Sequence, residues 1–201
     1  MKVVGLTGGS GTGKSKIASY FEKQYKAYLI DADQIGHKII KKGMPAYSLL
    51  IKHFGHTILD ETKEINRKKL GAMVFMDPEK LKLLNKITHP FIVSKIDETI
   101  TQCSLQDQQH SFIMIDGALL VEANVHKKVD ELWVVYANLD CRIKRLKKRD
   151  GLSQDQILQR IEGQMPWETL CQYAHRIIDN SGDFTETMMQ CDQIVKDFLG
   201  I

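Results

Sequence analysis

The sequence lacks the features that mark membrane-spanning, disulfide-rich and repetitive proteins. None of its apolar runs is as long as a membrane span, and its 201 residues contain no internal repeat or low-complexity segment. The four cysteines are far apart and form no C-x-x-C pair, so we expect reduced thiols instead of disulfides or zinc ligands. A chain of this length allows one compact domain with excursions.

A field of charge of one sign is also missing. The 28 basic and 25 acidic residues leave a net charge of +3, and the basic residues are spread out, so we expect no nucleic-acid partner. Met1 leads almost directly into Val3-Val4, without a signal-peptide pattern. We therefore expect a cytoplasmic protein with no membrane partner, as a monomer or a weak homo-oligomer.

A phosphate-binding loop is present close to the start of the chain. Residues 8–15 have the sequence Gly-Gly-Ser-Gly-Thr-Gly-Lys-Ser, which matches G-x-x-x-x-G-K-[ST]. A strand pattern precedes this run and a helix pattern over Lys14–Tyr25 follows it, as the motif requires. The glycines allow successive backbone N–H groups to converge on an anion at the positive end of the helix. A connecting turn without a ligand is the alternative.

The loop supplies most of the predicted nucleotide contacts. Lys14 should reach the β- and γ-phosphates, which also makes it a candidate catalytic residue, and the Ser15 hydroxyl should bind Mg²⁺. Asn180 lies in a later turn that could contact the adenine base. A guanine-reading Asn-Lys-x-Asp element, which a GTP-dependent switch would need, does not occur. The predicted nucleotide contacts are Gly9, Ser10, Gly11, Thr12, Gly13, Lys14, Ser15 and Asn180.

Apolar β-branched runs alternate with helical patterns, which predicts an α/β fold with a parallel sheet. The expected strands are 3–7, 27–30, 112–115, 132–136 and 176–178. A helical pattern at 33–41 follows the second strand. The stretch of about 60 residues after it, up to about Ser104, shows only helical patterns, at 46–54, 67–75, 79–88 and 91–103. This stretch is too long for a crossover and predicts an inserted helical subdomain that faces the ligand crevice. His89-Pro90 separates its last two expected helices, and a lone histidine there is more often a capping or packing residue than a catalyst.

Acidic residues end two of the predicted strands. Asp31 and Asp33 close the second strand two residues apart, so both should point toward the crevice. One of them could hold an acceptor hydroxyl in a phosphoryl-transfer enzyme, although capping of the next helix suits Asp33 equally well. Asp116 ends the third strand as in a Walker B element. Gly117 follows it in place of a catalytic acid, which disfavours a motor-type ATPase.

Three arginines follow the fourth predicted strand within one helical pattern. Arg142, Arg145 and Arg149 are three and four residues apart and share a face, and the guanidinium fork suits phosphate oxygens. Gly151 ends this helix, and a second helix is expected over residues 153–164. Two helices joined at a glycine form a natural lid over a triphosphate, and a solvated basic helix is the alternative.

In this order the motifs resemble the dephospho-coenzyme A kinase family over almost the whole chain. The P-loop alone is shared by many families, whereas the element that runs from Leu84-Asn85 to His89-Pro90 is much more specific. The residues that carry the resemblance are Leu6–Ser15, Asp31-Ala32-Asp33, Arg67-Lys68-Lys69-Leu70, Val74-Phe75, Leu84–Pro90, Leu119–Glu122, Arg145, Arg149, Gln164 and Ile178–Gly182.

The resemblance implies an α/β P-loop NTPase three-layer fold with a central parallel five-stranded sheet, an inserted helical substrate-binding subdomain and a helical lid. The implied core comprises residues 1–42, 105–138 and 176–201, with the acceptor-binding insertion at 43–104 and the lid at 139–175. The implied reaction transfers the γ-phosphoryl group of ATP, with Mg²⁺, to the ribose 3′-hydroxyl of dephospho-CoA. This is the final step of coenzyme A synthesis.

The resemblance also implies roles for individual residues. Asp33 matches the residue taken as the base, and Arg145 or Arg149 matches the lid arginine. The predicted catalytic residues are thus Asp33, Lys14, Arg145 and Arg149. The predicted acceptor contacts are Asp31, Asp33, His37, Arg67 and His89.

The chain departs from the family pattern at three places. Gly36-His37 stands where alanine-arginine is usual, Gly117-Ala118 replaces a residue-proline pair, and His175 stands where an acid is common. A neutral histidine cannot replace a guanidinium fork, which puts the acceptor contact of His37 in doubt. A kinase for another small molecule on the same scaffold is the alternative that the P-loop and the arginines fit equally.

Overall fold

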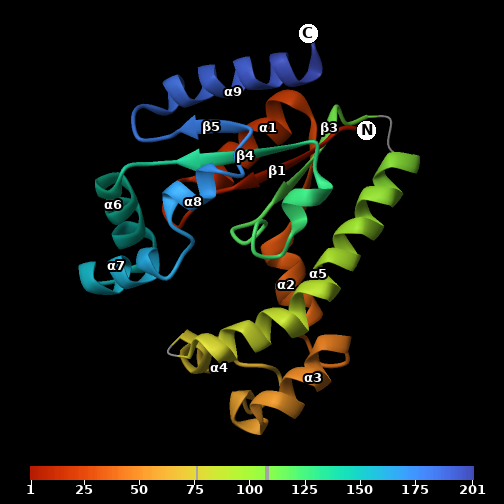
Figure 1. The fold of residues 1–201 in the computed structure, drawn as a ribbon, viewed down its shortest axis with the longest axis vertical. Coiled ribbons are helices and arrows are strands. Elements are labelled where there is room, and N and C mark those ends of the chain that lie inside the picture. The colour runs from red at the N-terminus through yellow and green to blue at the C-terminus, as the bar shows by residue number, and fades with distance from the viewer. Residues whose placement is uncertain (76, 107–108) are drawn as a thin grey trace. The chain divides into compact units, whose positions relative to one another are not determined.

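The computed structural model describes residues 1–75, 77–106 and 109–201 (Figure 1). The chain divides into two compact units. The first, the sheet unit, comprises Met1–Ile30 and Asp107–Ile201, and the second, the helical unit, comprises Asp31–Gln106. The sequence placed residues 31–42 with the core, whereas these residues belong to the helical unit because their helix packs on the long helix of that unit.

The sheet unit is built on five parallel strands in the order β2-β3-β1-β4-β5. Each of the five predicted strands is confirmed, with bounds that differ by at most one residue at either end. Because β1 is central, the loop that follows it begins in the middle of the carboxyl edge of the sheet. The strands are β1 Val3–Thr7, β2 Ala27–Asp31, β3 Phe112–Asp116, β4 Glu131–Tyr136 and β5 Arg176–Asp179.

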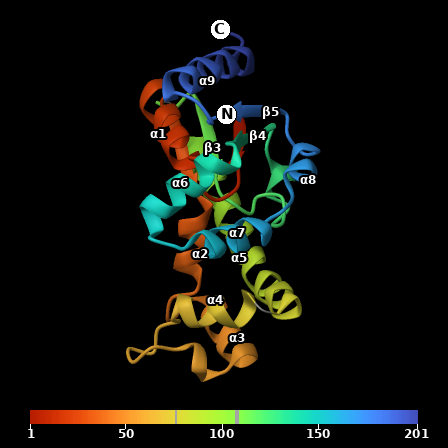
Figure 2. The ribbon, with the colours of Figure 1, turned by 90° about the vertical axis from the view of Figure 1, so that its left-hand side faces the viewer.

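Helices cover both faces of this sheet, which completes a three-layer α/β arrangement. Helices α1 and α9 pack on one face, and α1 and α8 lie on opposite sides of the strands (Figure 2). Asn138 caps α6 and Ser153 caps α7 through a capping box, so the expected helix-glycine-helix pair is present. The helices of this unit are α1 Lys14–Tyr25, α6 Leu139–Asp150, α7 Gln154–Glu162, α8 Trp167–Cys171 and α9 Phe184–Leu199, with a short 3₁₀ turn, η2, at Val125–Lys128.

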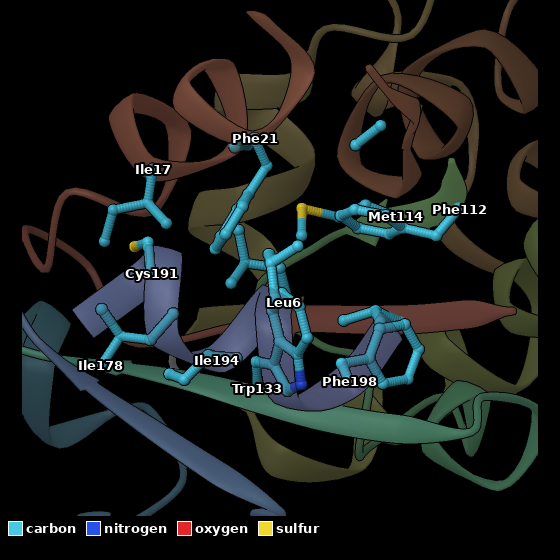
Figure 3. Close-up of a cluster of buried hydrophobic side chains, with 14 of the residues drawn as sticks. Leu6, Ile17, Phe21, Phe112, Met114, Trp133, Ile178, Cys191, Ile194 and Phe198 are labelled. Carbon is cyan, nitrogen blue, oxygen red and sulfur yellow. The ribbon is translucent and has the colours of Figure 1, made fainter. Parts of the chain in front are cut away.

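A dense aromatic core fixes α1, and with it the phosphate loop, to the sheet. Phe21 of α1 packs on Trp133 of β4 with ring centroids 5.2 Å apart, and Phe198 of α9 packs on the same indole at 5.4 Å (Figure 3). Full burial of each such side chain stabilises the fold by roughly 1.5–3 kcal/mol. The labelled core residues are Leu6, Ile17, Phe21, Phe112, Met114, Trp133, Ile178, Cys191, Ile194 and Phe198.

A polar clamp joins α1 to α9 beside this core. The hydroxyl groups of Tyr20 and Tyr25 both donate to the carboxylate of Asp192, the second at 2.7 Å. Burial and this hydrogen bond raise the pKa of Tyr25 to about 12 and that of Tyr20 further. Both hydroxyls therefore stay protonated donors, and α1 cannot rotate on the sheet without breaking them.

The helical unit has its own hydrophobic core, formed by the buried apolar faces of four helices. Leu50 and Ile58 are fully buried there, and Ile87 brings in the longest helix. None of the helices in the described part of the chain is long and apolar enough to cross a membrane. The helices of this unit are α2 Ala32–Ile39, α3 Pro45–Phe54, α4 Arg67–Phe75 and α5 Pro78–Gln106, with the 3₁₀ turn η1 at His56–Ile58.

The predicted break at His89-Pro90 is wrong, because α5 runs through Pro90 without interruption. Proline removes one backbone hydrogen bond and costs about 3 kcal/mol in a helix interior. Residues on both sides of it, Ile87 and Ile96, are buried, and α5 packs on α2, α3 and α4. This packing compensates for the lost bond, and the helix changes direction part-way along its length in Figure 1, as proline causes.

Candidate active site

The phosphate loop connects β1 to α1 in a conformation that only glycine allows at its key position. Gly13 has a φ of 89°, and a Cβ atom there would lie 2.3 Å from the side-chain nitrogen of Asn180. The Thr12 backbone N–H donates to the Gly9 carbonyl at 3.2 Å, and the Thr12 hydroxyl donates to the same oxygen at 2.9 Å. These two hydrogen bonds close the loop on itself.

Arg145 and Asn180 brace the loop by binding its carbonyl oxygens. The Arg145 guanidinium donates to the carbonyls of Thr12 at 3.1 Å, Gly11 at 3.4 Å and Asn180 at 2.7 Å. Asn180 is 3% exposed, and its Nδ2 donates to the Thr12 carbonyl at 2.7 Å. Thr187 of α9 donates to the Asn180 side-chain oxygen at 3.1 Å, which fixes the orientation of the amide.

Arg142 and Gln164 hold the first half of the loop in the same manner. Arg142 Nε donates to the Ser10 carbonyl at 2.8 Å, and its Nη2 donates to Gln164 Oε1 at 3.3 Å. The same Gln164 oxygen accepts from the Ser10 backbone N–H at 2.8 Å. Burial lowers the pKa of Arg142, which nevertheless remains a cation at neutral pH. These contacts tie α6 and Gln164, two residues beyond the end of α7, to the backbone of Ser10 in the loop.

Lys14 forms an ion pair with Asp116 at the end of β3. Both side chains are largely buried, at 12% and 14% exposure, so each ion offsets part of the cost of burying the other. The Walker B interpretation of Asp116 is consistent with this position, because the carboxylate meets the lysine of the phosphate loop. A triphosphate in the loop would compete with Asp116 for the same ammonium group.

Arg149 does not join Arg142 and Arg145 at the loop. Its Nε and Nη2 donate to the two carboxylate oxygens of Asp150 at 2.7 and 2.8 Å, and Arg160 of α7 binds the same carboxylate at 2.9 Å. These hydrogen bonds lower the pKa of Asp150 and raise that of Arg149. The arginines that share one face of α6 thus divide into two loop-binding residues and one at the α6–α7 junction.

The helical unit brings four of the five predicted acceptor contacts together. Asp31 caps α2, its side chain accepting from the Gln34 N–H at 2.7 Å, so the capping role falls on Asp31 and leaves Asp33 in the first turn. Burial lowers the pKa of His37, the charge of Arg67 lowers it further, and the charges of Asp33 and Asp31 raise it. His89 lies in α5, where burial lowers its pKa.

Few protein groups are available to bind a metal ion. Across residues 1–75, 77–106 and 109–201, no group of three or more His, Cys, Asp or Glu side chains is placed to hold one. The hydroxyl of Ser15 is exposed in the first turn of α1, and Asp116 supplies a carboxylate beside Lys14. This donor set fits Mg²⁺, which keeps several waters and takes further ligands from substrate phosphates.

Comparison with known proteins identifies the family. The family model described as dephospho-CoA kinase matches residues 2–186. The chain belongs to the dephospho-CoA kinase family. The dephospho-CoA kinase of Carboxydothermus hydrogenoformans is 42% identical over 190 residues, which cover 94% of this chain and 91% of that protein.

Solved structures share the fold of this chain. The dephospho-CoA kinase from Campylobacter jejuni superimposes with a TM-score of 0.69 at 26% identity, covering 100% of this chain and 98% of that one. The protein TT1252 from Thermus thermophilus gives a TM-score of 0.80 at 23% identity over 98% and 97% of the two chains. The α/β P-loop NTPase fold expected from the sequence is confirmed.

Arg142, Gln164 and Thr187 help to hold this site and were absent from the predicted catalytic and binding residues. Arg142 carried a sequence signal, since it shares the helical spacing of Arg145, and Gln164 is among the residues that resemble the family. Thr187 carried none, because its contact with Asn180 depends on how α9 returns to the sheet. Backbone carbonyls as the partners of the arginines could not be inferred from side-chain types.

Proposed function

We propose that this protein transfers the γ-phosphoryl group of ATP to the ribose 3′-hydroxyl of dephospho-CoA and so completes coenzyme A synthesis. The observation that carries the proposal is the intact phosphate loop, with Lys14 paired to Asp116, in a chain that matches the dephospho-CoA kinase family over residues 2–186. The loop supplies the donor site, and the family match supplies the acceptor.

On the donor side, the backbone N–H groups of residues 9–15 bind the phosphates and Lys14 contacts the β- and γ-phosphates. Ser15 and Asp116 would hold Mg²⁺, which would neutralise charge on the triphosphate. Arg145 donates to carbonyl oxygens of the loop, so the N–H groups of the loop stay directed at the ligand without rearrangement. Asn180 places the following turn near the adenine base.

On the acceptor side, Asp33 accepts the proton of the ribose hydroxyl as the phosphoryl group is transferred. Asp31, His37, Arg67 and His89 bind the acceptor. Support for this assignment is that the charges of Asp31, Asp33 and Arg67 all act on His37. Residues 139–175 serve as the lid, and either Arg145, at the loop, or Arg149, at the α6–α7 junction, supplies the lid arginine.

We further propose that the enzyme works in the cytoplasm on small molecules only, as a monomer or weak homo-oligomer. All four cysteines are free thiols, as a reducing compartment would keep them. The net charge of +3 supports neither a nucleic-acid nor a membrane partner.

The test is product analysis by mass spectrometry after the purified chain is mixed with MgATP and dephospho-CoA. Coenzyme A and ADP should form in equal amounts with the wild-type protein and not with Lys14→Ala. A panel of other hydroxyl acceptors, including shikimate and nucleoside monophosphates, addresses the alternative of a different small-molecule kinase. Phosphorylation of one of those in preference to dephospho-CoA would overturn the proposal.

A further inference from the structure

A cavity of about 340 Å³ lies in the sheet unit beside the phosphate loop. Gly8 and Gly9 form one side of it, the segment after β3 forms a second, and the end of β4 with residues 161–170 closes the rest. The volume is at the lower end of the range for small-molecule sites, about 300–1,000 Å³. It therefore suits one ring system of a substrate and not an entire coenzyme.

The walls of this cavity are mainly apolar and include two aromatic rings. Tyr136 and Trp167 lie with ring centroids 4.7 Å apart at an interplanar angle of 47°. Both rings are only partly buried, and Leu119, which also lines the cavity, is 45% exposed. An aromatic and aliphatic wall left open to solvent beside a nucleotide loop favours a flat heteroaromatic ligand.

Glu122 supplies a carboxyl group among these apolar side chains. It is half-buried, and desolvation raises its pKa. The other ionisable groups of the lining are engaged or exposed: Arg142 is bound to Ser10 and Gln164, and Glu162 is exposed to solvent. The Glu122 carboxyl accepts a hydrogen bond from its own backbone N–H, and its remaining lone pairs can accept from a ligand N–H donor.

We propose that this cavity binds the adenine base of the acceptor, with the exocyclic amino group of the base donating to Glu122. The inference rests on the proposed function, which supplies an acceptor that contains adenine. The donor base is assigned to the turn at Asn180, which contacts Thr12 and Gly13 and does not line the cavity. A base held beside Gly8 and Gly9 places its ribose next to the phosphate nest, where the reacting hydroxyl must lie.

Tryptophan fluorescence tests occupancy of the cavity directly. The chain has two tryptophans, and Trp133 is fully buried in the core, so a ligand in the cavity should act on Trp167. Dephospho-CoA without ATP should quench the emission to saturation, and the quenching should be lost in Trp167→Phe, with circular dichroism unchanged. Saturable quenching by ATP at lower concentration than by dephospho-CoA would assign the cavity to the donor. No response to either ligand would also overturn the inference.

A change of base tests the role of Glu122. The deaminated acceptor, which carries hypoxanthine, has an oxygen in place of the exocyclic amino group and should be used at least about tenfold less well by the wild type. Glu122→Gln should reduce or reverse this preference, since its amide can donate to that oxygen. Glu168→Gln, an exposed residue of α8 outside the cavity, is the matched control.

Equal preference for adenine in the wild type and in Glu122→Gln would remove Glu122 from base recognition. The experiments distinguish a wrong assignment of the cavity from a wrong proposed function. If the wild-type protein forms coenzyme A but shows neither the quenching nor the base preference, only the cavity assignment is wrong. If it forms no coenzyme A, the proposed function itself is wrong.

Discussion

The two units hold their functional residues in different ways. In the sheet unit, Arg142, Arg145, Gln164 and Asn180 are all hydrogen-bonded to the backbone of the phosphate loop. In the helical unit, Asp31, Asp33 and Arg67 are exposed side chains that influence His37 through their charge. The donor loop is thus held in place by hydrogen bonds from the protein itself, whereas the acceptor residues are exposed charges on α2 and α4.

This difference has an energetic basis. A loop whose carbonyl groups are satisfied from outside keeps its N–H groups directed at the phosphates, and little reorganisation is needed as charge develops in the transition state. Exposed charges on helices are screened by solvent and are worth less until a substrate covers them. Substitutions in the sheet unit should therefore change turnover. Substitutions of the acceptor-binding residues in the helical unit should mainly change acceptor use, with the exception of the proposed base Asp33.

The largest effect is expected from Lys14→Ala. The change removes the ammonium group from the β- and γ-phosphates and also breaks the ion pair with Asp116. Steady-state kinetics should show turnover below about a tenth of the wild-type rate. Circular dichroism serves as the control for folding, and a folded variant above that rate would contradict the assignment.

Asp33→Asn should follow, with a strong loss of kcat and a modest change in KM. The amide cannot accept the proton of the hydroxyl group, and this role develops only in the transition state. Asp31→Asn is the matched control, because Asp31 already serves as the cap of α2 and its amide can still accept from Gln34. A greater loss in Asp31→Asn would show that the wrong carboxylate was assigned.

Much of the sheet unit could be predicted from the sequence, because its signals are local. Apolar runs of strand length and the spacing of Gly8, Gly13 and Lys14 define β1 and its loop without knowledge of the rest. The continuity of α5 could not be predicted in this way, since it depends on packing around Pro90 by helices distant in sequence. Likewise, the three arginines share one face of the predicted helix, so the sequence provided no reason to expect different partners for Arg145 and Arg149.

Lysine substitutions test whether Arg145 and Arg149 have different roles. Arg145 makes three hydrogen bonds that bridge the loop and Asn180, a fork that lysine cannot reproduce, so Arg145→Lys should lower kcat by at least about tenfold. Arg149→Lys, one helical turn away, should cost less, because lysine can still pair with Asp150. Single-turnover kinetics decides the order. A larger loss in Arg149→Lys would mean that Arg149, at the α6–α7 junction, and not Arg145, at the phosphate loop, is the essential lid arginine.

His89→Ala should produce a smaller effect, confined to the acceptor. If the helical unit recognises dephospho-CoA, the KM for dephospho-CoA should rise several-fold while the KM for ATP stays within about twofold. His53→Ala, an exposed histidine of α3 in the same unit, provides the control. Equal changes in both KM values would count against a role of His89 on the acceptor side.

The smallest effect concerns the stability of the helical unit toward acid. Burial lowers the pKa of His89 below its ordinary value of 6.5, so the unfolded chain binds a proton at higher pH than the folded chain. The free energy of unfolding should therefore fall as the pH drops through 6.5 and below. Well above pH 6.5, His89 should cause no loss of stability. His89→Gln, which cannot titrate, should flatten this dependence in urea unfolding curves of the full chain between about pH 8 and pH 5.5. His37, whose pKa burial also lowers, should leave part of the slope in that variant. An unchanged slope in His89→Gln would show that His89 is as solvated in the folded protein as in the unfolded chain.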